Sequence, residues 1–354
     1  MEVYSLPPES LMKTLRDRID KDLHDFFKEQ SRVRIDSVCM EVRDRIRDFT
    51  LMGGKRVRPM LVIMGHDLFS LPDERVTRAA ISIELTQSYL LIHDDIMDQS
   101  ETRRGNPSLH ASLRKHIEKL TPDASRISQN LAIVAGDLAD SFAHQALLGS
   151  GMEPKLLIRA NMELSRIIET TGYGQLIDID SSYNEGFAQR DLLRLHILKT
   201  AKYTIEGPLL MGAMLSPHHP DLKPLSYYGN LLGTAFQLHD DILGLFGDEQ
   251  ETGKSIKSDV NEGKKTLLIL KAIENSSSSD QEFLKRSIRS GNVSDSEFQK
   301  IRKIVMDSGS YDYSRRMITR MIGRCKDYLG EVQGDQRIKS FLSWFADYLV
   351  ERKN

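Results

Sequence analysis

Two aspartates spaced four residues apart, Asp94 and Asp98, stand at the end of an apolar stretch of the sequence. If that stretch is helical, both carboxylates lie on one face, about one turn apart. Two negative charges at that distance repel each other by roughly 4 kcal/mol at an effective dielectric constant near 20. Mg²⁺ removes this repulsion, because it takes oxygen ligands and often joins carboxylates to substrate phosphates. The pair therefore predicts a magnesium–phosphate site, although a solvated acidic helix end shows the same pattern.

Two arginines follow this acidic pair within a short polar loop. Arg103 and Arg104 belong to the segment Glu-Thr-Arg-Arg-Gly at residues 101–105. A guanidinium group is planar and can hold a phosphate through paired hydrogen bonds. Arginines beside a carboxylate pair therefore favour a ligand that carries both phosphate and metal.

The tetrapeptide around the first acidic pair occurs a second time. His-Asp-Asp-Ile at residues 93–96 returns at residues 239–242, again after an apolar stretch. We expect two helices that end in the same acidic cluster to form two walls of one polyanion site. The repetition also disfavours a merely solvated acidic surface.

Basic residues and glycines follow the second cluster too. Lys254 and Lys264 lie in glycine-containing segments downstream of Asp241, with Asp259 between them. Ammonium groups neutralise phosphate oxygens, and glycine lets a loop approach a ligand closely. The segment Gly-Lys-Lys-Thr at 263–266 lacks the spacing and the preceding strand of a P-loop, so we reject that interpretation.

The composition narrows the class of function. The chain has 354 residues with 49 basic and 51 acidic side chains, and its net charge of −2 argues against nucleic-acid binding. No apolar run approaches the roughly 18 residues of a membrane span, and residues 1–4 do not resemble the start of a signal peptide. Cys39 and Cys325 lie far apart and form no Cys-x-x-Cys pair. We therefore expect a soluble, cytoplasmic protein in a reducing compartment.

Helices must position these residues, because helical periodicity dominates the sequence and no alternating β-branched run is convincing. The pattern predicts two charged amphipathic helices within 9–50, with a break near Ser31, and a loop at 52–59. Further helices are expected at about 60–70, 75–98, 125–149, 153–181, 188–215, 222–247, 263–275 and, in several pieces, 280–352. This predicts one all-α domain over 1–354, with its core at about 50–270.

Several segments in this order resemble the trans-isoprenyl diphosphate synthase family, which includes short-chain farnesyl and geranylgeranyl diphosphate synthases. The matching segments are Gly-Gly-Lys-Arg-Val-Arg-Pro at 53–59, Asp-Asp-x-x-Asp with Arg-Arg-Gly at 94–105, Gly-Gln-Leu-Ile-Asp at 174–178, Lys-Thr at 199–200 and Phe-Gln-x-x-Asp-Asp at 236–241. The resemblance implies a large helical bundle of the isoprenoid synthase type, with a deep central cavity, in a homodimer. It also implies condensation of isopentenyl diphosphate with an allylic diphosphate (dimethylallyl, geranyl or farnesyl).

The resemblance implies three Mg²⁺ ions per active site and assigns carboxylates to them. The metal ligands and supporting carboxylates that match the family's motifs are Asp94, Asp95, Asp98, Asp178, Asp240 and Asp241. The sequence departs from the family at Gly244, where many relatives carry the last aspartate of the second motif. Because Asp240 remains, we expect the second wall to bind metal with an incomplete carboxylate set.

The resemblance also assigns the two diphosphates. The residues implied for the allylic diphosphate are Arg103, Lys199, Lys254 and Lys264. The residues implied for isopentenyl diphosphate are Lys55, Arg58, Gln87 and Arg104. Thr200 and Gln237 are expected to face the reacting carbons. The implied reaction ionises the allylic diphosphate, adds the isopentenyl double bond to the cation and loses a proton, which requires that water be excluded.

Product length in this family depends on the floor of the cavity. Tyr89 lies five residues before Asp94, about 7–8 Å along a helix. A single aromatic at that position, with the non-aromatic Leu90 after it and no insertion, resembles archaeal-type geranylgeranyl synthases. Thr86 shares the face of Tyr89 and leaves room beside the ring. We predict a C20 product, with C15 or both lengths as the alternative, unless Tyr89 is only a core aromatic.

Two other functions share part of this pattern. A terpene cyclase has the same fold and first acidic motif, but usually carries an Asn/Asp-Ser/Thr-Glu motif on the second wall. A non-catalytic synthase subunit usually has degraded aspartates. The second His-Asp-Asp-Ile and the basic residues at 55–58 disfavour both, and a generic Mg²⁺- and phosphate-binding helical protein is the least specific alternative.

Overall fold

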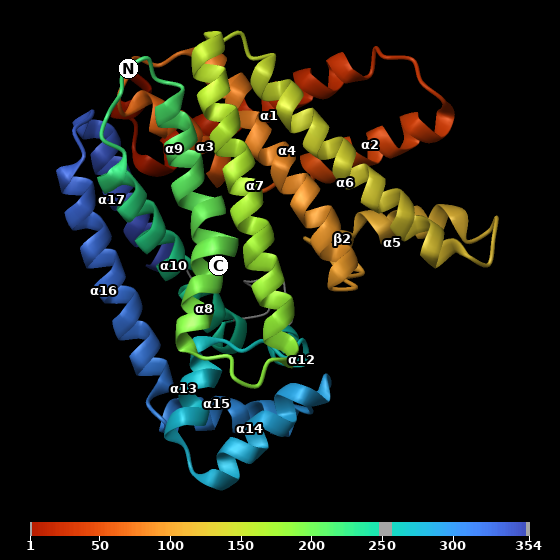
Figure 1. The fold of residues 1–354 in the computed structure, drawn as a ribbon, viewed down its shortest axis with the longest axis vertical. Helices are drawn as coiled ribbons and strands as arrows, with labels where there is room; N and C mark the ends of the chain where they lie inside the picture. Colours follow the sequence, from red (N-terminus) through yellow and green to blue (C-terminus); the bar gives the residue numbers. More distant parts are fainter. Residues whose placement is uncertain (1, 248–256, 352–354) are drawn as a thin grey trace. The chain divides into compact units, whose positions relative to one another are not determined.

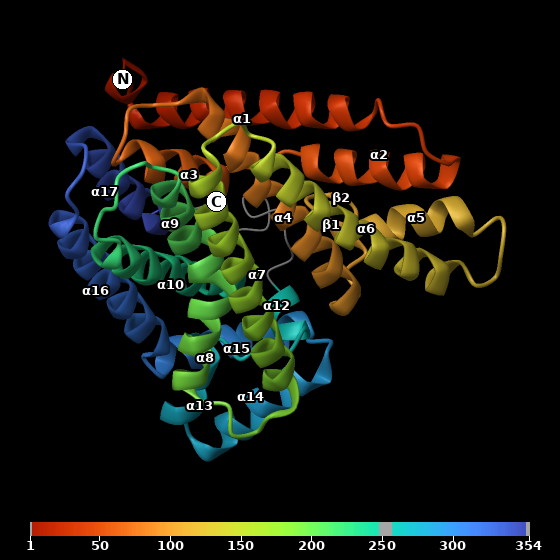
Figure 2. The ribbon, with the colours of Figure 1, turned by 45° about the horizontal axis from the view of Figure 1, so that its top comes forward.

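The structure is a computed structural model, and it describes residues 2–247 and 257–351. Within these ranges the regular secondary structure is almost entirely helical (Figures 1 and 2). Its one strand pair there joins β1 (Thr102–Arg103) to β2 (Asn106–Pro107). No helix in the described part is long and apolar enough to cross a membrane. The predicted all-α fold is therefore confirmed.

The chain forms two compact units, the N-terminal unit (residues 1–164 and 208–220) and the C-terminal unit (165–207 and 221–354). The elements of the N-terminal unit are η1 (Glu2–Ser5), α1 (Pro8–Gln30), α2 (Ser37–Leu51), α3 (Val57–Asp67), α4 (Glu74–Met97), the β1–β2 pair, α5 (Leu109–Ile117), α6 (Ala124–Leu148), the first part of α7 (Pro154–Tyr183) and most of α9 (Gly207–Met214). The elements of the C-terminal unit are the rest of α7, α8 (Gln189–Leu195), η2 (His196–Glu206), α10 (Lys223–Phe246), α12 (Ser258–Asn261), α13 (Leu267–Asn275), α14 (Ser278–Ser290), α15 (Asp295–Asp307), α16 (Ser310–Glu331) and α17 (Gln336–Glu351).

Helix α4 is the core helix of the N-terminal unit. Its residues from Ala79 to Ser88 are buried on every side, whereas several of those from Tyr89 to Met97 are half-buried or exposed. Figures 1 and 2 show α6 running beside α4, and the two helices pack along much of their length. The burial pattern places the acidic end of α4 where the helix leaves the core.

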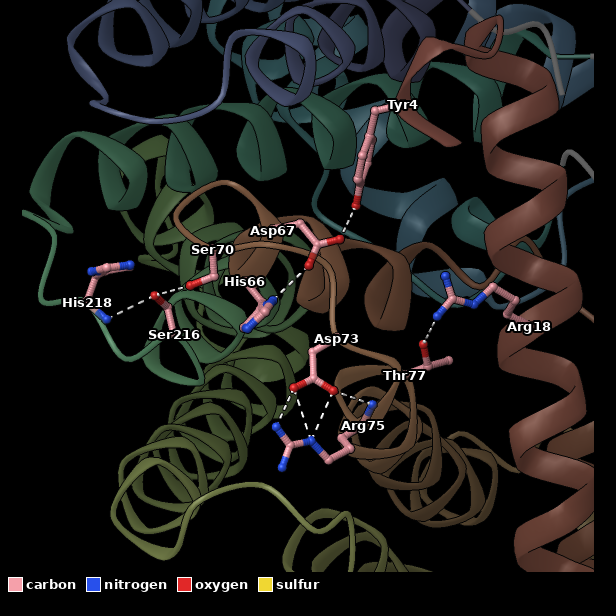
Figure 3. Close-up of polar contacts among 10 residues, drawn as sticks. All are labelled: Tyr4, Arg18, His66, Asp67, Ser70, Asp73, Arg75, Thr77, Ser216 and His218. Atoms are coloured by element: carbon pink, nitrogen blue, oxygen red, sulfur yellow. Dashed lines mark hydrogen bonds and ion pairs between the residues drawn. The ribbon is translucent and has the colours of Figure 1, made fainter. Parts of the chain in front are cut away.

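Polar contacts fix the ends of α3 and α4 (Figure 3). The Tyr4 hydroxyl donates to Asp67 Oδ2 at 2.5 Å, and His66 Nδ1 lies 2.7 Å from the other Asp67 oxygen. Asp73 caps α4, because its carboxylate accepts the Arg75 backbone N–H at 2.9 Å. An N-cap of this kind satisfies a backbone donor that would otherwise lack a partner.

In the C-terminal unit, α10 packs against η2 and α16. Helix η2 is a π-helix, and it carries Lys199 and Thr200. The sequence predicted one helix over 188–215, but the structure divides it into α8, η2 and α9. Pro208 lies at the start of α9 and has no N–H to continue the α-helical ladder, which accounts for the change of register there.

Candidate active site

The acidic end of α4 places the carboxylates of Asp94 and Asp98 on one face of the helix. The Asp98 backbone N–H donates to the Asp94 carbonyl at 2.8 Å, so Asp98 extends the face that Asp94 begins. The Asp94 side chain is 21% exposed and Asp98 is more exposed. Both donor groups are oxygens that solvent and ligand can reach, which fits Mg²⁺.

Asp95 points away from that face into the protein. Its side chain is 1% exposed, and Arg103 binds it through Nε at 2.6 Å and Nη2 at 2.5 Å. Burial raises the pKa of Asp95, although the Arg103 hydrogen bond and charge oppose that shift. The same Arg103 Nη2 lies 3.7 Å from Asp94 Oδ2. Asp95 therefore orients Arg103 beside the exposed carboxylates; its predicted role in supporting bound metal stays a prediction.

A small pocket opens beside this arginine in the N-terminal unit. It is lined by Phe49, Thr50, Met52, Glu84, Gln87, Ser88, Leu91, Arg103 and Arg104. Burial lowers the pKa of Arg104, and the charges of Arg56, Arg58 and Arg103 lower it further. Arg103 and Arg104 place two guanidinium groups on the wall of the pocket beside the single carboxylate of Glu84, and this positive excess favours an anion. The structure thus brings Gln87 and Arg104 together, as the predicted anion site requires.

The loop at 53–59 is held in place by Arg56, whose role the sequence did not reveal. Its guanidinium is 2% exposed and binds Asp20 at 2.7 Å and Glu84 at 2.6 Å. Arg56 has a φ of +50°, in the left-handed region, which turns its side chain inward. Lys55 is exposed and Arg58 is half-buried, and neither lines the pocket. The three basic residues at 55, 56 and 58 carry no sequence signal that separates the buried one from the other two.

The residues predicted to set the product length lie more than one helical turn before Asp94 on α4. Tyr89 and Leu90 are half-buried, and Thr86 is fully buried. Burial raises the pKa of Tyr89, and the charges of Asp140 and Asp137 on α6 raise it further. Tyr89 is thus close to α6, at the level where α4 leaves the core.

In the C-terminal unit, Lys199 and Asp178 form an ion pair. Lys199 Nζ lies 2.5 Å from Asp178 Oδ2, and both side chains are 28% exposed. Gly174 allows this approach, because a Cβ there would lie 2.5 Å from the Lys199 backbone nitrogen. The pair sets an ammonium group and a carboxylate side by side, which suits a ligand that carries phosphate and metal.

A chain of polar contacts runs from η2 to α10. Thr200 Oγ1 donates to Gln237 Oε1 at 2.9 Å, and Gln237 Nε2 donates to Asp241 Oδ1 at 3.1 Å. Burial and the charge of Asp259 raise the pKa of Asp241 to about 7. His196 Nε2 lies 3.5 Å from the other Asp241 oxygen, and burial lowers the pKa of His196 to about 3. His196 has no motif to mark it, and the sequence analysis missed it.

Asp259 lies against Gly244, the position of the missing aspartate. A Cβ at residue 244 would lie 2.2 Å from Asp259 Oδ2. Lys264 Nζ binds the other Asp259 oxygen at 2.8 Å. Burial opposes the charge of Lys264, but Asp259 outweighs it and raises the pKa. Asp240 is half-buried, and Lys254, the remaining predicted residue, lies outside the described residues.

The metal ligands that the sequence predicted fall in both units. Asp94 and Asp98 belong to the N-terminal unit, whereas Asp178, Asp240 and Asp241 belong to the C-terminal unit. Within the described ranges, no three His, Cys, Asp or Glu side chains form a preformed metal cluster. Each predicted ligand supplies carboxylate oxygen, the donor that Mg²⁺ prefers. That the two acidic helix ends act as walls of one site stays a prediction.

Comparison with known proteins bears on this chemistry. The polyprenyl synthetase family model matches residues 40–305. A geranylgeranyl diphosphate synthase of Sulfolobus acidocaldarius is 30% identical over 85% of this chain and 88% of its own length. A geranylfarnesyl diphosphate synthase of Aeropyrum pernix is 32% identical over 85% of this chain and 91% of its own.

Solved structures agree with the sequence matches. A geranylgeranyl pyrophosphate synthase from Corynebacterium glutamicum, complexed with isoprenyl diphosphate and magnesium, is 30% identical. It superimposes with a TM-score of 0.87 over 98% of this chain and all of its own. The relatives thus share both sequence and fold with this protein along most of its length. The chain belongs to the polyprenyl synthetase family and is a polyprenyl diphosphate synthase that acts as a short-chain prenyltransferase.

Proposed function

We propose that this enzyme makes C20 geranylgeranyl diphosphate from isopentenyl diphosphate and shorter allylic diphosphates. The observation that carries the proposal is Tyr89, a single half-buried aromatic ring just over one turn before Asp94, followed by the non-aromatic Leu90. Such a ring limits the room for a growing prenyl chain. Relatives named geranylgeranyl diphosphate synthase, at 27–30% identity, support the same length.

The metal requirement follows from the carboxylates. We propose that Asp94, Asp98 and Asp240 hold Mg²⁺, three ions per active site, with Asp178 and Asp241 in support. When bound, Mg²⁺ neutralises the diphosphate and makes it a better leaving group. The Corynebacterium relative was solved with magnesium and isoprenyl diphosphate, which supports this assignment.

The protein's own residues orient the substrates and shield the allylic carbocation from water. In this proposal Gln87, Arg104, Lys55 and Arg58 bind isopentenyl diphosphate, whereas Arg103, Lys199 and Lys264 bind the allylic diphosphate. The oxygens of Thr200 and Gln237, linked at 2.9 Å, provide fixed dipoles toward the allylic carbons. The apolar side chains beside these residues keep water from the carbocation.

We also propose a homodimer that pairs through α6 and α7. Apolar side chains lie exposed on both helices in the N-terminal unit, namely Ile133, Val134, Leu138, Ile158 and Met162, which are 37–69% exposed. His144 of α6 lies 2.6 Å from Asn161 of α7, so the two helices meet in this region. Apolar patches of this kind are typical of interfaces between subunits. A second copy of the chain supplies the matching surface in a twofold dimer.

The product assay tests the function. Purified enzyme, labelled isopentenyl diphosphate, Mg²⁺ and each allylic primer are incubated, and the dephosphorylated alcohols are separated by chromatography. We expect C20 as the main product from every primer. A main product of C15, or of C25 as the name of the Aeropyrum relative suggests, would overturn the assigned length.

The dimer is tested separately by sedimentation. We expect a twofold mass for the wild type, and a monomer for Val134→Glu combined with Met162→Glu. Substitution of the exposed Met306 on α15 by glutamate is the matched control and should leave the mass unchanged. A monomeric wild type would overturn the dimer without affecting the product assignment.

A further inference from the structure

His93, the residue before Asp94, faces α6 and has no assigned role. Its Nε2 lies 2.9 Å from the carbonyl oxygen of Ile133. Because a carbonyl oxygen can only accept, Nε2 carries the proton and donates. The side chain is 25% exposed, and the Asp137 carboxylate lies 3.9 Å from the same nitrogen. The imidazole is therefore tied to the backbone of α6.

Gly136 provides the space that this ring occupies. A Cβ at residue 136 would lie 2.3 Å from His93 Nε2 and 2.5 Å from its Cδ2. Nonbonded atoms do not approach that closely, so any larger residue at 136 must displace the imidazole. The glycine and the Ile133 carbonyl together hold the ring in one position against α6.

The other side of the same ring contacts Tyr89. The two ring centroids are 5.0 Å apart, and the planes meet at 76°, an edge-to-face contact. Tyr89 precedes His93 by four residues, so both side chains project from the same face of α4. His93 thus stands between the α6 backbone and the ring of Tyr89.

We propose that His93, seated on Gly136, fixes the position of the Tyr89 ring and so determines where the growing prenyl chain stops. His93 is a positioning residue for product length, and it acts through Tyr89. The inference rests on the proposed function, in which Tyr89 is the floor of the prenyl site. A ring that loses its edge-to-face contact gains rotamers, and some of them open the space that a longer chain needs.

Three variants separate the parts of this contact. His93→Gln retains a donor for the Ile133 carbonyl but loses the ring, whereas His93→Phe retains the ring but loses the donor. Gly136→Ala displaces the ring from the other helix without altering α4. Gly323→Ala on α16 is the matched control, because a Cβ there meets nothing within 4 Å. Each is measured by the ratio of products longer than C20 to C20, with the melting temperature recorded in parallel.

We expect His93→Gln and Gly136→Ala to raise this ratio about two- to tenfold, the range over which one aromatic contact shifts a rotamer equilibrium. His93→Phe, which keeps an aromatic ring against Gly136 but loses the hydrogen bond, should raise the ratio less than His93→Gln, and Gly323→Ala should stay close to the wild type. In a Tyr89→Ala background, which lengthens the product itself, His93→Gln should change the ratio no further. A merely structural role for His93 lowers the melting temperature and total turnover but not the ratio of products.

The outcomes distinguish the two proposals. If Tyr89→Ala lengthens the product but neither His93→Gln nor Gly136→Ala does, this inference is wrong and the assigned floor stands. Equal lengthening by His93→Gln in the wild-type and Tyr89→Ala backgrounds also overturns it, because His93 then acts independently of Tyr89. An unchanged product spectrum for Tyr89→Ala overturns the floor itself, and the inference with it.

Discussion

The sequence His-Asp-Asp-Ile occurs at the ends of α4 and α10, and the two copies have different surroundings. In α4 the second aspartate, Asp95, is 1% exposed and bound to Arg103 at 2.5 Å. In α10 the second aspartate, Asp241, is 8% exposed and meets the neutral amide of Gln237 and the imidazole of His196. The pKa of Asp241 rises to about 7, because burial there is not offset by an adjacent arginine.

The histidines of the two copies differ as well. His93 is 25% exposed and donates to the α6 backbone, whereas His239 is buried in the C-terminal unit. In both copies the first aspartate is half-buried and lies at the surface of the core. The repeated residues therefore give both helices an outward carboxylate, and the neighbouring helices decide what the other residues do.

The largest effect is expected at the two outward aspartates. Asp94→Asn and Asp240→Asn should each lower kcat by roughly 10²- to 10³-fold, because in the proposed assignment each removes a charge that holds metal at the leaving diphosphate. Steady-state kinetics with isopentenyl and allylic diphosphates measure the loss, and circular dichroism checks the fold. Asp307→Asn, an exposed aspartate of α15, is the control. An active Asp240→Asn enzyme would show that the His-Asp-Asp-Ile segments of α4 and α10 are not equivalent in function.

The next effect tests the ion pair of the first copy. Arg103→Met should lower the free energy of unfolding by about 3 kcal/mol, because it leaves the buried Asp95 charge without its partner. Urea denaturation measures this loss. The double variant Arg103→Met with Asp95→Asn should recover part of it, and Arg126→Met, which breaks an exposed pair with Asp123, should cost less than about 0.5 kcal/mol. Equal losses for both arginines would contradict the assigned pair.

The second copy makes stability depend on pH. Asp241 has a folded-state pKa of about 7, well above its ordinary value of 3.8, so the folded state binds a proton that the unfolded state releases above pH 4. This contribution is complete below the unfolded pKa and is lost as pH rises toward 7. Between pH 5 and 7.5, without Mg²⁺, it should account for a fall of about 2 kcal/mol in unfolding free energy.

Asp241→Asn removes that proton equilibrium while the side chain keeps its size. Urea denaturation of the metal-free protein at pH 5, 6, 7 and 7.5 should show a shallower decline for the variant than for the wild type. Asp95→Asn is measured in the same way for comparison, because Asp95 is bound to an arginine whereas Asp241 is not. If the unfolding free energy falls equally with pH in the wild type and in Asp241→Asn, the predicted difference between the two His-Asp-Asp-Ile segments is wrong.

The smallest effect concerns how the two helices begin. Asp73 caps α4, whereas the N-cap residue of α10, Leu222, has no side-chain acceptor (Figure 3 shows Asp73). Asp73→Ala should cost about 1 kcal/mol of unfolding free energy, the usual value of a lost cap. Thermal and urea denaturation measure it. Asp123→Ala at the start of α6, where no side-chain cap bond forms, is the matched control and should cost less.

Much of the helical fold could be predicted, and the reasons are local. The apolar run before Asp94 predicted a helix at 75–98, and α4 covers Glu74–Met97. The run before Asp240 predicted 222–247, and α10 covers Lys223–Phe246. The short helix α5 and the two-residue strands were not predicted, because nine-residue and two-residue elements carry too little periodicity. The π-helical register of η2 was missed because its sequence also fits an α-helix.

The candidate site was predictable where a motif marks it. Gln87 and Arg104 do line one pocket, and Lys199 does lie beside Asp178. Arg56 was missed because its inward direction depends on a backbone φ of +50°. His196 was missed because its contact with Asp241 joins residues 45 positions apart in the chain, on separate helices. The assignment of these residues to particular substrates stays a prediction.

The sequence by itself determined the family, through five short motifs in a fixed order along the chain. It also determined the all-α fold and the outward carboxylates, because both depend on residue spacing within single helices. Only the tertiary structure decided which charge stays buried, which arginine anchors a loop and which ring stands beside Tyr89. Those outcomes depend on desolvation and on partners from other helices, and neither is encoded in the spacing of one segment. Identical tetrapeptides at 93–96 and 239–242 therefore hold an ion pair in one unit and a titratable carboxyl in the other.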